Sequence, residues 1–378
     1  MGAFALAWWF KDWGIYSLTI APRRTISYPP SNISLHYAEH ITSAKTSRPQ
    51  FCPLRLKMEL TSPSRMPLPV RPEHQTNHPP PPDYIEYGRS YSGFRKGKYM
   101  FPIDDNEMDR MDIYHKFFSV ARREALHSTP FIENYDKGPR VLDLGCGTGI
   151  WAIDMAEKYH HRNVEVKGID LAVIQPARIP PGLVFSQRDI ESPWWWCEVD
   201  SWDLIHMRML AGSISSWQDT YTQIFRHLKP QFGWLEHVEI DMEPRCDDGT
   251  LPADSSIIQW TKLLFDATAQ AYRPLQYNHR TGAMLQEIGF VDINEQIIKV
   301  PLNPWENDPQ LKDIGRWYNL GLTQGLDALT TAPLTRMFGW SKVDVDRLVA
   351  KVKREICSKK LHVYCNVHIW IARRPADA

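Results

Sequence analysis

The chain has 378 residues, with 44 lysines and arginines against 44 aspartates and glutamates, so its formal net charge is zero. Its length and its 43% hydrophobic content allow a large core and exclude a wholly disordered chain. The longest apolar runs, such as residues 3–10, are too short to cross a bilayer as a helix, so no membrane segment is expected. The six cysteines form no CxxC pair, which indicates a reducing compartment and no structural metal site.

The first 83 residues differ in composition from the rest. Residues 1–72 hold nine basic and three acidic residues, a net charge of +6 that leaves −6 for the remainder. Eight of the 22 residues from Thr61 to Pro82 are prolines, which lack a backbone donor and favour polyproline II. We predict a disordered, basic, Pro/Ser-rich arm over residues 1–83, which either meets an acidic partner or is only solvated. If Met1 is a wrongly chosen start codon, Met58 and Met66 are the alternative first residues.

From Tyr84 onward, strand-like and helix-like segments alternate. Strands are predicted at residues 140–144, 164–170, 182–188, 202–207, 234–240, 292–300 and 361–372. Helices are predicted at 150–159, 221–228, 257–271 and 281–288, and residues 309–358 are expected to be mainly helical. Such alternation indicates an α/β fold with a doubly wound, mainly parallel sheet.

A glycine-rich turn follows the first of these strands. The string from Val141 to Gly149 reads VLDLGCGTG, so a hydrophobic strand runs into GxGxG and then a helix. Glycines let the backbone turn sharply and let a ligand approach it closely. Asp143 precedes the first glycine by two residues, and its carboxylate would repel a pyrophosphate but suit an ammonium group. The pair of features therefore favours S-adenosylmethionine over a dinucleotide.

Two further acidic residues follow in the order that this ligand requires. Asp170 ends the second strand, where a carboxylate can accept hydrogen bonds from ribose hydroxyls. Asp189 follows the third strand and can accept from the adenine amino group, with Ile190 against the ring. The predicted cofactor residues are Asp143, Gly145, Cys146, Gly147, Thr148, Gly149, Asp170, Leu171, Asp189, Ile190 and His206.

The order of these motifs resembles that of class I S-adenosylmethionine-dependent methyltransferases. More specific segments resemble the LaeA-type fungal regulators of secondary metabolism: residues 88–99, 109–115, 149–154, 239–248, 301–305 and 316–320. The similarity covers about residues 86–375. It implies a Rossmann-like domain over 84–378 with seven strands and helices on both faces. Within it we expect an N-terminal helical cap (84–138), a cofactor-binding half (139–243) and a substrate-side half (244–378) with a helical insertion at 303–360.

The resemblance also implies a biological setting that the residues alone do not indicate. LaeA-type proteins are nuclear methyltransferase-like regulators of transcription, secondary metabolism, development and sporulation, with velvet-domain proteins as partners. By resemblance we expect a regulator that is located in the nucleus, with the cytoplasm as a second location. Direct nucleic-acid binding is not expected, because the part after the arm is acidic and phosphate contacts require basic faces.

Residues that would carry the chemistry are harder to identify. Methyl transfer can be catalysed by alignment alone, and a base is needed only when the acceptor must first lose a proton. His206, His237 and Glu239 are weak candidates, as each can equally be a structural hydrogen-bond partner. Met207 or Met209 could itself accept a methyl group, although methionines beside a strand usually belong to the core. Tyr91, Phe94, Tyr99 and His115 could form a lid over the cofactor.

Three functions remain open at this point. The chain could methylate protein, itself included, within a regulatory complex, and an open groove with an aromatic rim would mark this case. It could methylate a small acid or other metabolite, which a buried cationic pocket would mark, with contributions from Arg208, Arg245 or Arg273. It could also be a regulatory scaffold that binds the cofactor with little turnover and lacks an organised acceptor pocket.

Overall fold

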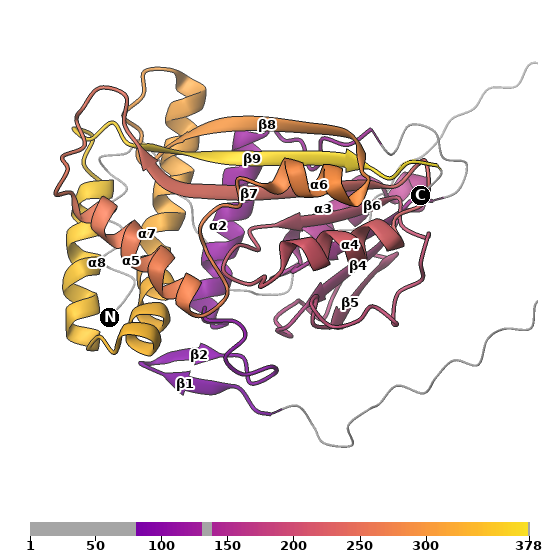
Figure 1. Ribbon diagram of the computed structural model, residues 1–378, viewed down its shortest axis with the longest axis horizontal. Helices are drawn as coiled ribbons and strands as arrows, with labels where there is room; N and C mark the ends of the chain where they lie inside the picture. Colours follow the sequence, from indigo (N-terminus) through magenta and orange to yellow (C-terminus); the bar gives the residue numbers. More distant parts are fainter. Residues whose placement is uncertain (1–80, 131–137, 377–378) are drawn as a thin grey trace, which may run out of the picture. The chain divides into compact units, whose positions relative to one another are not determined.

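The computed structural model describes residues 81–130 and 138–376 (Figure 1). The chain divides into two units, Met1–Pro72 and Glu73–Ala378, and all described residues belong to the second. The predicted arm over residues 1–83 therefore lies almost entirely outside the described residues. No helix in the described part is long and apolar enough to cross a membrane.

A seven-stranded sheet forms the centre of this unit, in the order β5-β4-β3-β6-β7-β9-β8. The strands are β3 (Arg140–Leu144), β4 (Glu165–Asp170), β5 (Leu183–Gln187), β6 (Leu204–Arg208), β7 (Trp234–Arg245), β8 (Val291–Pro301) and β9 (Tyr364–Arg373). β9 runs antiparallel to both neighbours, and the other paired strands are parallel. The chain order reverses between β3 and β6, which is where a doubly wound sheet binds its ligand.

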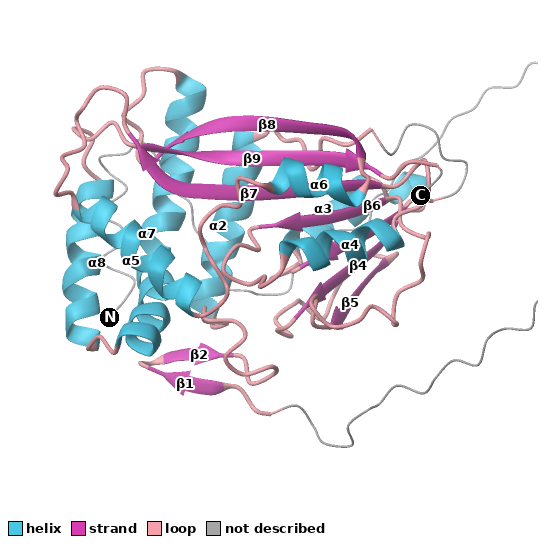
Figure 2. Ribbon diagram, viewed as in Figure 1, coloured by secondary structure: helices cyan, strands magenta, loops and turns pink. Residues whose placement is uncertain are grey.

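Helices cover both faces of the sheet, as Figure 2 shows. They are α2 (Asp105–Ala121), α3 (Ile150–Lys158), the short 3₁₀ helix η2 (His160–Arg162), α4 (Trp217–His227), α5 (Ser256–Gln270), α6 (Thr281–Ile288), α7 (Pro309–Phe338) and α8 (Lys342–Ile356). α3 packs on the face that carries Val141, Val166 and Leu204. α4 and α6 pack on the opposite face, against side chains such as Leu142 and Ile205. Because helices cover both faces, side chains on both sides of each central strand are apolar. The strands therefore appear in the sequence as short, nearly continuous apolar runs.

Helices α5, α7 and α8 gather at one end of the long strands β7, β8 and β9 (Figure 1). They form the largest core cluster together with α2, through buried side chains such as Phe117, Leu264 and Leu322. In the sequence, α7 and α8 follow β8 and precede β9. They form the helical insertion that the sequence indicates. α7 begins after Asp308, whose side chain accepts a hydrogen bond from the backbone N–H of Leu311.

The element boundaries agree with the predicted ones to within three residues except in three places. β7 continues to Arg245, five residues beyond the predicted end, because β9 pairs with it up to Tyr364 across an irregularity between Asp241 and Arg245. α4 begins at Trp217 rather than Tyr221, since Ser216 caps it. The predicted helical cap contains α2, but also a hairpin of β1 (Tyr84–Glu86) and β2 (Arg89–Tyr91) that the sequence pattern did not reveal.

Candidate functional site

The turn between β3 and α3 takes the shape that its glycines allow. Gly145, Gly147 and Gly149 all have positive φ angles, of 68°, 55° and 79°. The backbone N–H groups of Gly145 and Cys146 donate to the carbonyl of Ile169 on β4, at 2.9 and 3.0 Å. The turn is therefore attached to the neighbouring strand and presents its outer edge to a cavity beyond the strand ends.

Asp170 supports this turn from the end of β4. One carboxylate oxygen accepts from the N–H of Gly147 at 2.8 Å, and the other accepts from the N–H of Ala172 at 2.8 Å. Burial raises the pKa of this carboxyl above its ordinary value, although the two N–H donors act in the opposite direction. Asp170 thus holds the glycine turn and also lines the cavity.

A second carboxylate, Asp143, is buried at the end of β3 and pairs with a histidine. Its Oδ1 lies 2.8 Å from Nδ1 of His206 on β6, and burial raises the pKa of Asp143 to about 7. The imidazole of His206 stacks on the indole of Trp151, with ring centroids 3.6 Å apart. Burial lowers the pKa of His206 well below its ordinary value, so the ring is neutral near pH 7 and can donate its Nδ1–H to the ionised carboxylate.

These groups border a cavity of about 150 Å³ that the N-terminal cap covers. From the cap, Ser92, Tyr99, Ile103, Arg110, Met111 and Tyr114 line it. Thr148, near the end of the turn, donates to Asp112 on α2 at 2.7 Å, which ties the cap to the turn. The spacing of Met111 and Tyr114, one helical turn apart, is the sequence signal that could have identified this side of the cavity.

The cavity brings together nine of the eleven predicted cofactor residues: Asp143, Gly145, Cys146, Gly147, Thr148, Asp170, Leu171, Ile190 and His206. Gly149 and Asp189 do not line it. Gly149 is instead the N-cap of α3, and a Cβ there would lie 2.3 Å from the ring of Phe185. Asp189 forms an ion pair with Lys98 of the cap and accepts from Ser192 at 3.1 Å. The neighbouring Ile190 does line the cavity, and a carboxylate can accept further hydrogen bonds beside these, so contact between Asp189 and an adenine amino group stays a prediction.

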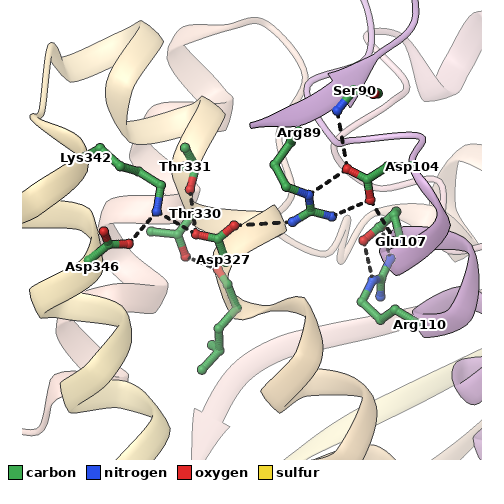
Figure 3. A network of polar contacts seen from close by, with 11 residues as sticks. Arg89, Ser90, Asp104, Glu107, Arg110, Asp327, Thr330, Thr331, Lys342 and Asp346 are labelled. Atoms are coloured by element: carbon green, nitrogen blue, oxygen red, sulfur yellow. Dashed lines mark hydrogen bonds and ion pairs between the residues drawn. The ribbon is translucent and has the colours of Figure 1, made fainter. Parts of the chain in front are cut away.

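A cluster of charged side chains fixes the cap to the helical insertion. Figure 3 shows Arg89 between two carboxylates, with its Nε 2.7 Å from Asp104 and its Nη1 3.2 Å from Asp327 on α7. Lys342 of α8 also approaches Asp327, at 2.9 Å. We call Arg89, Asp104, Asp327 and Lys342 the clasp. It joins residues 238 positions apart and holds the beginning of α2, the helix that lines the cavity.

The remaining catalytic candidates lie away from the cavity. His237 is buried beside α4, where its Nδ1 is 3.0 Å from the hydroxyl of Tyr221. Glu239 accepts from the N–H groups of Leu210 and Ala211, both at 3.0 Å, and so shapes the loop after β6. Neither residue lines this cavity or the larger one described below, and in the structure both act as hydrogen-bond partners of other residues. Met207 is fully buried in the core, whereas Met209 lines the cavity.

A second cavity of about 420 Å³ opens between α2 and α3. Trp151 and Arg208 line both cavities, so the two adjoin at the end of β6. Of the three arginines considered as an acidic-substrate site, only Arg208 lies in a cavity. Arg245 pairs with Asp241, and Arg273 pairs with Glu191 at 2.7 Å.

Comparison with known proteins identifies the family. Residues 116–294 match the family described as "Methyltransferase domain". The chain is 59% identical to "Secondary metabolism regulator LAE1" of Cochliobolus heterostrophus over 295 residues, which covers 78% of this chain and 95% of that protein. The chain belongs to the LAE1/LaeA family of secondary metabolism regulators. It is also 46% identical to the laeA regulator of Aspergillus flavus, over 80% of this chain and 81% of that protein.

Solved structures resemble this LaeA-family chain at lower similarity. Phosphoethanolamine N-methyltransferase 2 of Haemonchus contortus, solved with S-adenosyl-L-methionine, matches with a TM-score of 0.42 and 18% identity. The match covers 69% of this chain and 53% of that one, about half its length. The [4+2]-cyclase SpnF matches with a TM-score of 0.38 and 17% identity, over 73% of this chain and 99% of that one.

The sheet order and the methyltransferase domain confirm the expected fold. The LaeA-family chain has the class I S-adenosylmethionine-dependent methyltransferase fold, with a mainly parallel seven-stranded sheet and one reversed strand, β9. The cofactor of this fold is S-adenosylmethionine.

Proposed function

We propose that the chain binds S-adenosylmethionine in the cavity at the ends of β3 and β4 and uses it for methyl transfer. The observation that carries the proposal is the lining of that cavity, where the glycine turn lies between two carboxylates, the buried Asp143 and the half-buried Asp170. A cation and a sugar with two hydroxyls are the groups that such a pair of carboxylates suits. The turn leaves room for them, because Gly147 has no side chain to fill the space next to Met111.

Each of these residues has a distinct task in the proposal. Asp143 would hold the amino-acid ammonium group, Asp170 the ribose hydroxyls, and Ile190 would pack against the adenine. When bound, the cofactor supplies a methyl group on a sulfonium centre that an acceptor can attack. The chain's own part is to orient the two molecules and exclude water, and the cap residues Tyr99 and Met111 lie where they can do so.

The names of the relatives support a biological role for this activity. Relatives from three fungal genera, at 42–59% identity, are called secondary metabolism regulators, and we propose the same role here. A protein acceptor, a nuclear location and velvet-domain partners follow from the resemblance alone and stay predictions. Co-purification from nuclear extracts with and without the arm over residues 1–83 tests the last two.

Calorimetric titration of the whole chain with S-adenosylmethionine tests the proposal. A wild-type dissociation constant on the order of micromolar is expected, corresponding to about −8 kcal/mol. Gly147→Arg places a long side chain in the cavity and should abolish binding. Gly249→Arg is the matched control, because Gly249 also has a positive φ but faces open space. A folded wild-type chain that binds no S-adenosylmethionine would overturn the proposal.

A further inference from the structure

The second cavity contains an arginine that has no carboxylate in contact with its guanidinium. Arg208 follows His206 by two residues, at the end of β6, and its guanidinium is enclosed by α2 and α3. The contacts of that guanidinium are Nδ1 of His115, 3.3 Å from Nη2, and the ring of Phe118, 4.7 Å from Cζ. Burial lowers the pKa of Arg208 to about 10, so the group remains charged near pH 7. Among the described residues, no carboxylate oxygen lies in ion-pair contact with it.

Two other charged side chains of this cavity, Arg122 and Asp154, are paired within the protein. Arg122 forms two hydrogen bonds with Glu236, both of 3.0 Å. Asp154 lies 2.8 Å from Nε2 of His115, which fixes the imidazole with its Nδ1 lone pair toward Arg208. A charge withdrawn from water without a partner is costly. Lys158 is exposed at the rim of the cavity, whereas the guanidinium of Arg208 is half-buried and, unlike that of Arg122, has no carboxylate of the described part in contact with it.

We propose that the cavity between α2 and α3 binds a small carboxylic acid whose carboxylate pairs with Arg208. A guanidinium presents parallel N–H donors that match the two oxygens of a carboxylate. The volume of about 420 Å³ lies within the range of small-molecule sites, roughly 300–1,000 Å³. Phe118 and Trp151 provide aromatic surface for the carbon skeleton of the acid.

The charges at the rim favour a carboxylate over a phosphate monoester. Glu124, Asp154 and Glu157 line the same cavity, and they would repel a dianion more strongly than a monoanion. A single free guanidinium also balances one negative charge rather than two. The site is therefore matched to a monoanionic group with an apolar or aromatic remainder.

The position of Arg208 places such an acid beside the donor. Because Arg208 and Trp151 line both cavities, an acid held there lies next to the S-adenosylmethionine site, where an acceptor belongs. This part of the inference rests on the proposed function. Methylation of a carboxylate oxygen requires no base, since a new O–C bond replaces the C–S bond and the products are a methyl ester and S-adenosylhomocysteine. The absence of a free base among His206, His237 and Glu239 is compatible with such an acceptor.

Binding measurements on the whole chain test the inference. The probes are benzoate, phenylacetate and butyrate, with benzamide and inorganic phosphate as neutral and dianionic controls. We expect at least one carboxylate to bind in the millimolar range or tighter, and the controls to bind at least 10-fold more weakly. Arg208→Gln should weaken carboxylate binding at least 10-fold. Arg208→Lys should weaken it less, because lysine keeps the positive charge and lacks only the two parallel N–H donors.

Two controls separate the possible outcomes. Arg347→Gln removes the same charge from an exposed position on α8 and should change carboxylate binding less than 2-fold. A far-UV circular dichroism spectrum and a thermal midpoint like those of the wild type would show that Arg208→Gln is folded. If the wild type binds S-adenosylmethionine but none of the carboxylates, or if Arg347→Gln weakens them as much as Arg208→Gln does, this inference is overturned and the proposed function stands. A folded wild-type chain that does not bind S-adenosylmethionine would instead overturn the proposed function.

Discussion

The imidazole of His206 lies flat on the indole of Trp151, with the two ring planes 8° from parallel. The contact joins the middle of β6 to the first turn of α3, and it holds Nδ1 of His206 against the carboxylate of Asp143. Asp143, His206 and Trp151 thus come from three different elements, and their burial together governs the protonation of the Asp143 carboxyl in the cofactor cavity. The consequence is that protons and ligand compete for Asp143.

Asp143 should make cofactor binding depend on pH. Its pKa of about 7 without ligand means that it is protonated at lower pH and cannot pair with an ammonium group. We expect the affinity for S-adenosylmethionine to rise about 10-fold between pH 5.5 and 7.0, since a pKa difference of one unit is worth about 1.4 kcal/mol. Asp143→Asn should bind more weakly and show a flat profile over this range. Calorimetry in buffers of different ionisation enthalpy measures both the affinity and the released proton.

The same group should affect stability in the opposite sense. Burial raises the pKa of Asp143 above its ordinary value of 3.8, so between about pH 4 and 7 the folded chain holds a proton that the unfolded chain has released. The contribution of Asp143 to the free energy of unfolding therefore falls as the pH rises through this window and is constant above it. Urea denaturation of wild type and Asp143→Asn at pH 5 and 7.5 measures the difference. A wild type that gains stability relative to the variant as the pH rises would contradict this assignment.

The clasp should couple the insertion to the cofactor cavity. Arg89→Ala removes three hydrogen bonds to Asp104 and Asp327. We expect it to lower the free energy of unfolding by about 1–3 kcal/mol and to weaken S-adenosylmethionine binding, because the cap lines the cavity. Arg347→Ala breaks an exposed pair with Asp344 and should cost less than about 0.5 kcal/mol. Equal effects of the two substitutions would show that the clasp has no special role.

Removing one partner of the buried pair Arg122 and Glu236 should destabilise the fold strongly, whereas replacing both partners with apolar residues should not. Burial alone would raise the pKa of Glu236, but the Arg122 guanidinium holds it below its ordinary value. Arg122→Met leaves this carboxylate unpaired and should cost about 3–5 kcal/mol. The double variant Arg122→Met with Glu236→Leu should recover much of that loss. Chemical denaturation of the two single variants and the double variant measures the coupling, and simple additivity would count against it.

Glu239 offers a test between structure and catalysis. Glu239→Ala leaves the N–H groups of Leu210 and Ala211 without their acceptor and should cost about 1–3 kcal/mol of unfolding free energy. Glu239→Gln keeps an acceptor oxygen, so it should restore most of the stability and bind S-adenosylmethionine as the wild type does. A catalytic carboxylate would behave differently, because methyl transfer by the Gln variant would then be as impaired as by the Ala variant.

Local signals in the sequence predicted the sheet and the glycine turn. The string from Val141 to Gly149 contains both the strand and the residues that let it turn, so nothing distant is needed to recognise it. The ion pair between Asp189 and Lys98 could not be read from the sequence, because the two residues lie 91 positions apart. The pairing of Arg122 with Glu236, 114 residues apart, could not be found from periodicity either. Arg208 was a candidate from its place after β6, but only the structure shows that it lacks a carboxylate partner while Arg245 and Arg273 have one.

Hydrogen–deuterium exchange of the whole chain with and without S-adenosylmethionine tests the central claim most directly, because it locates the bound ligand by peptide. The account predicts added protection in the peptides that cover the glycine turn (145–149), the residues after β4 (170–174) and the cap (99–114), and none of this protection in Gly147→Arg. Binding that protects other segments and leaves these three unchanged would show that the cofactor cavity lies elsewhere.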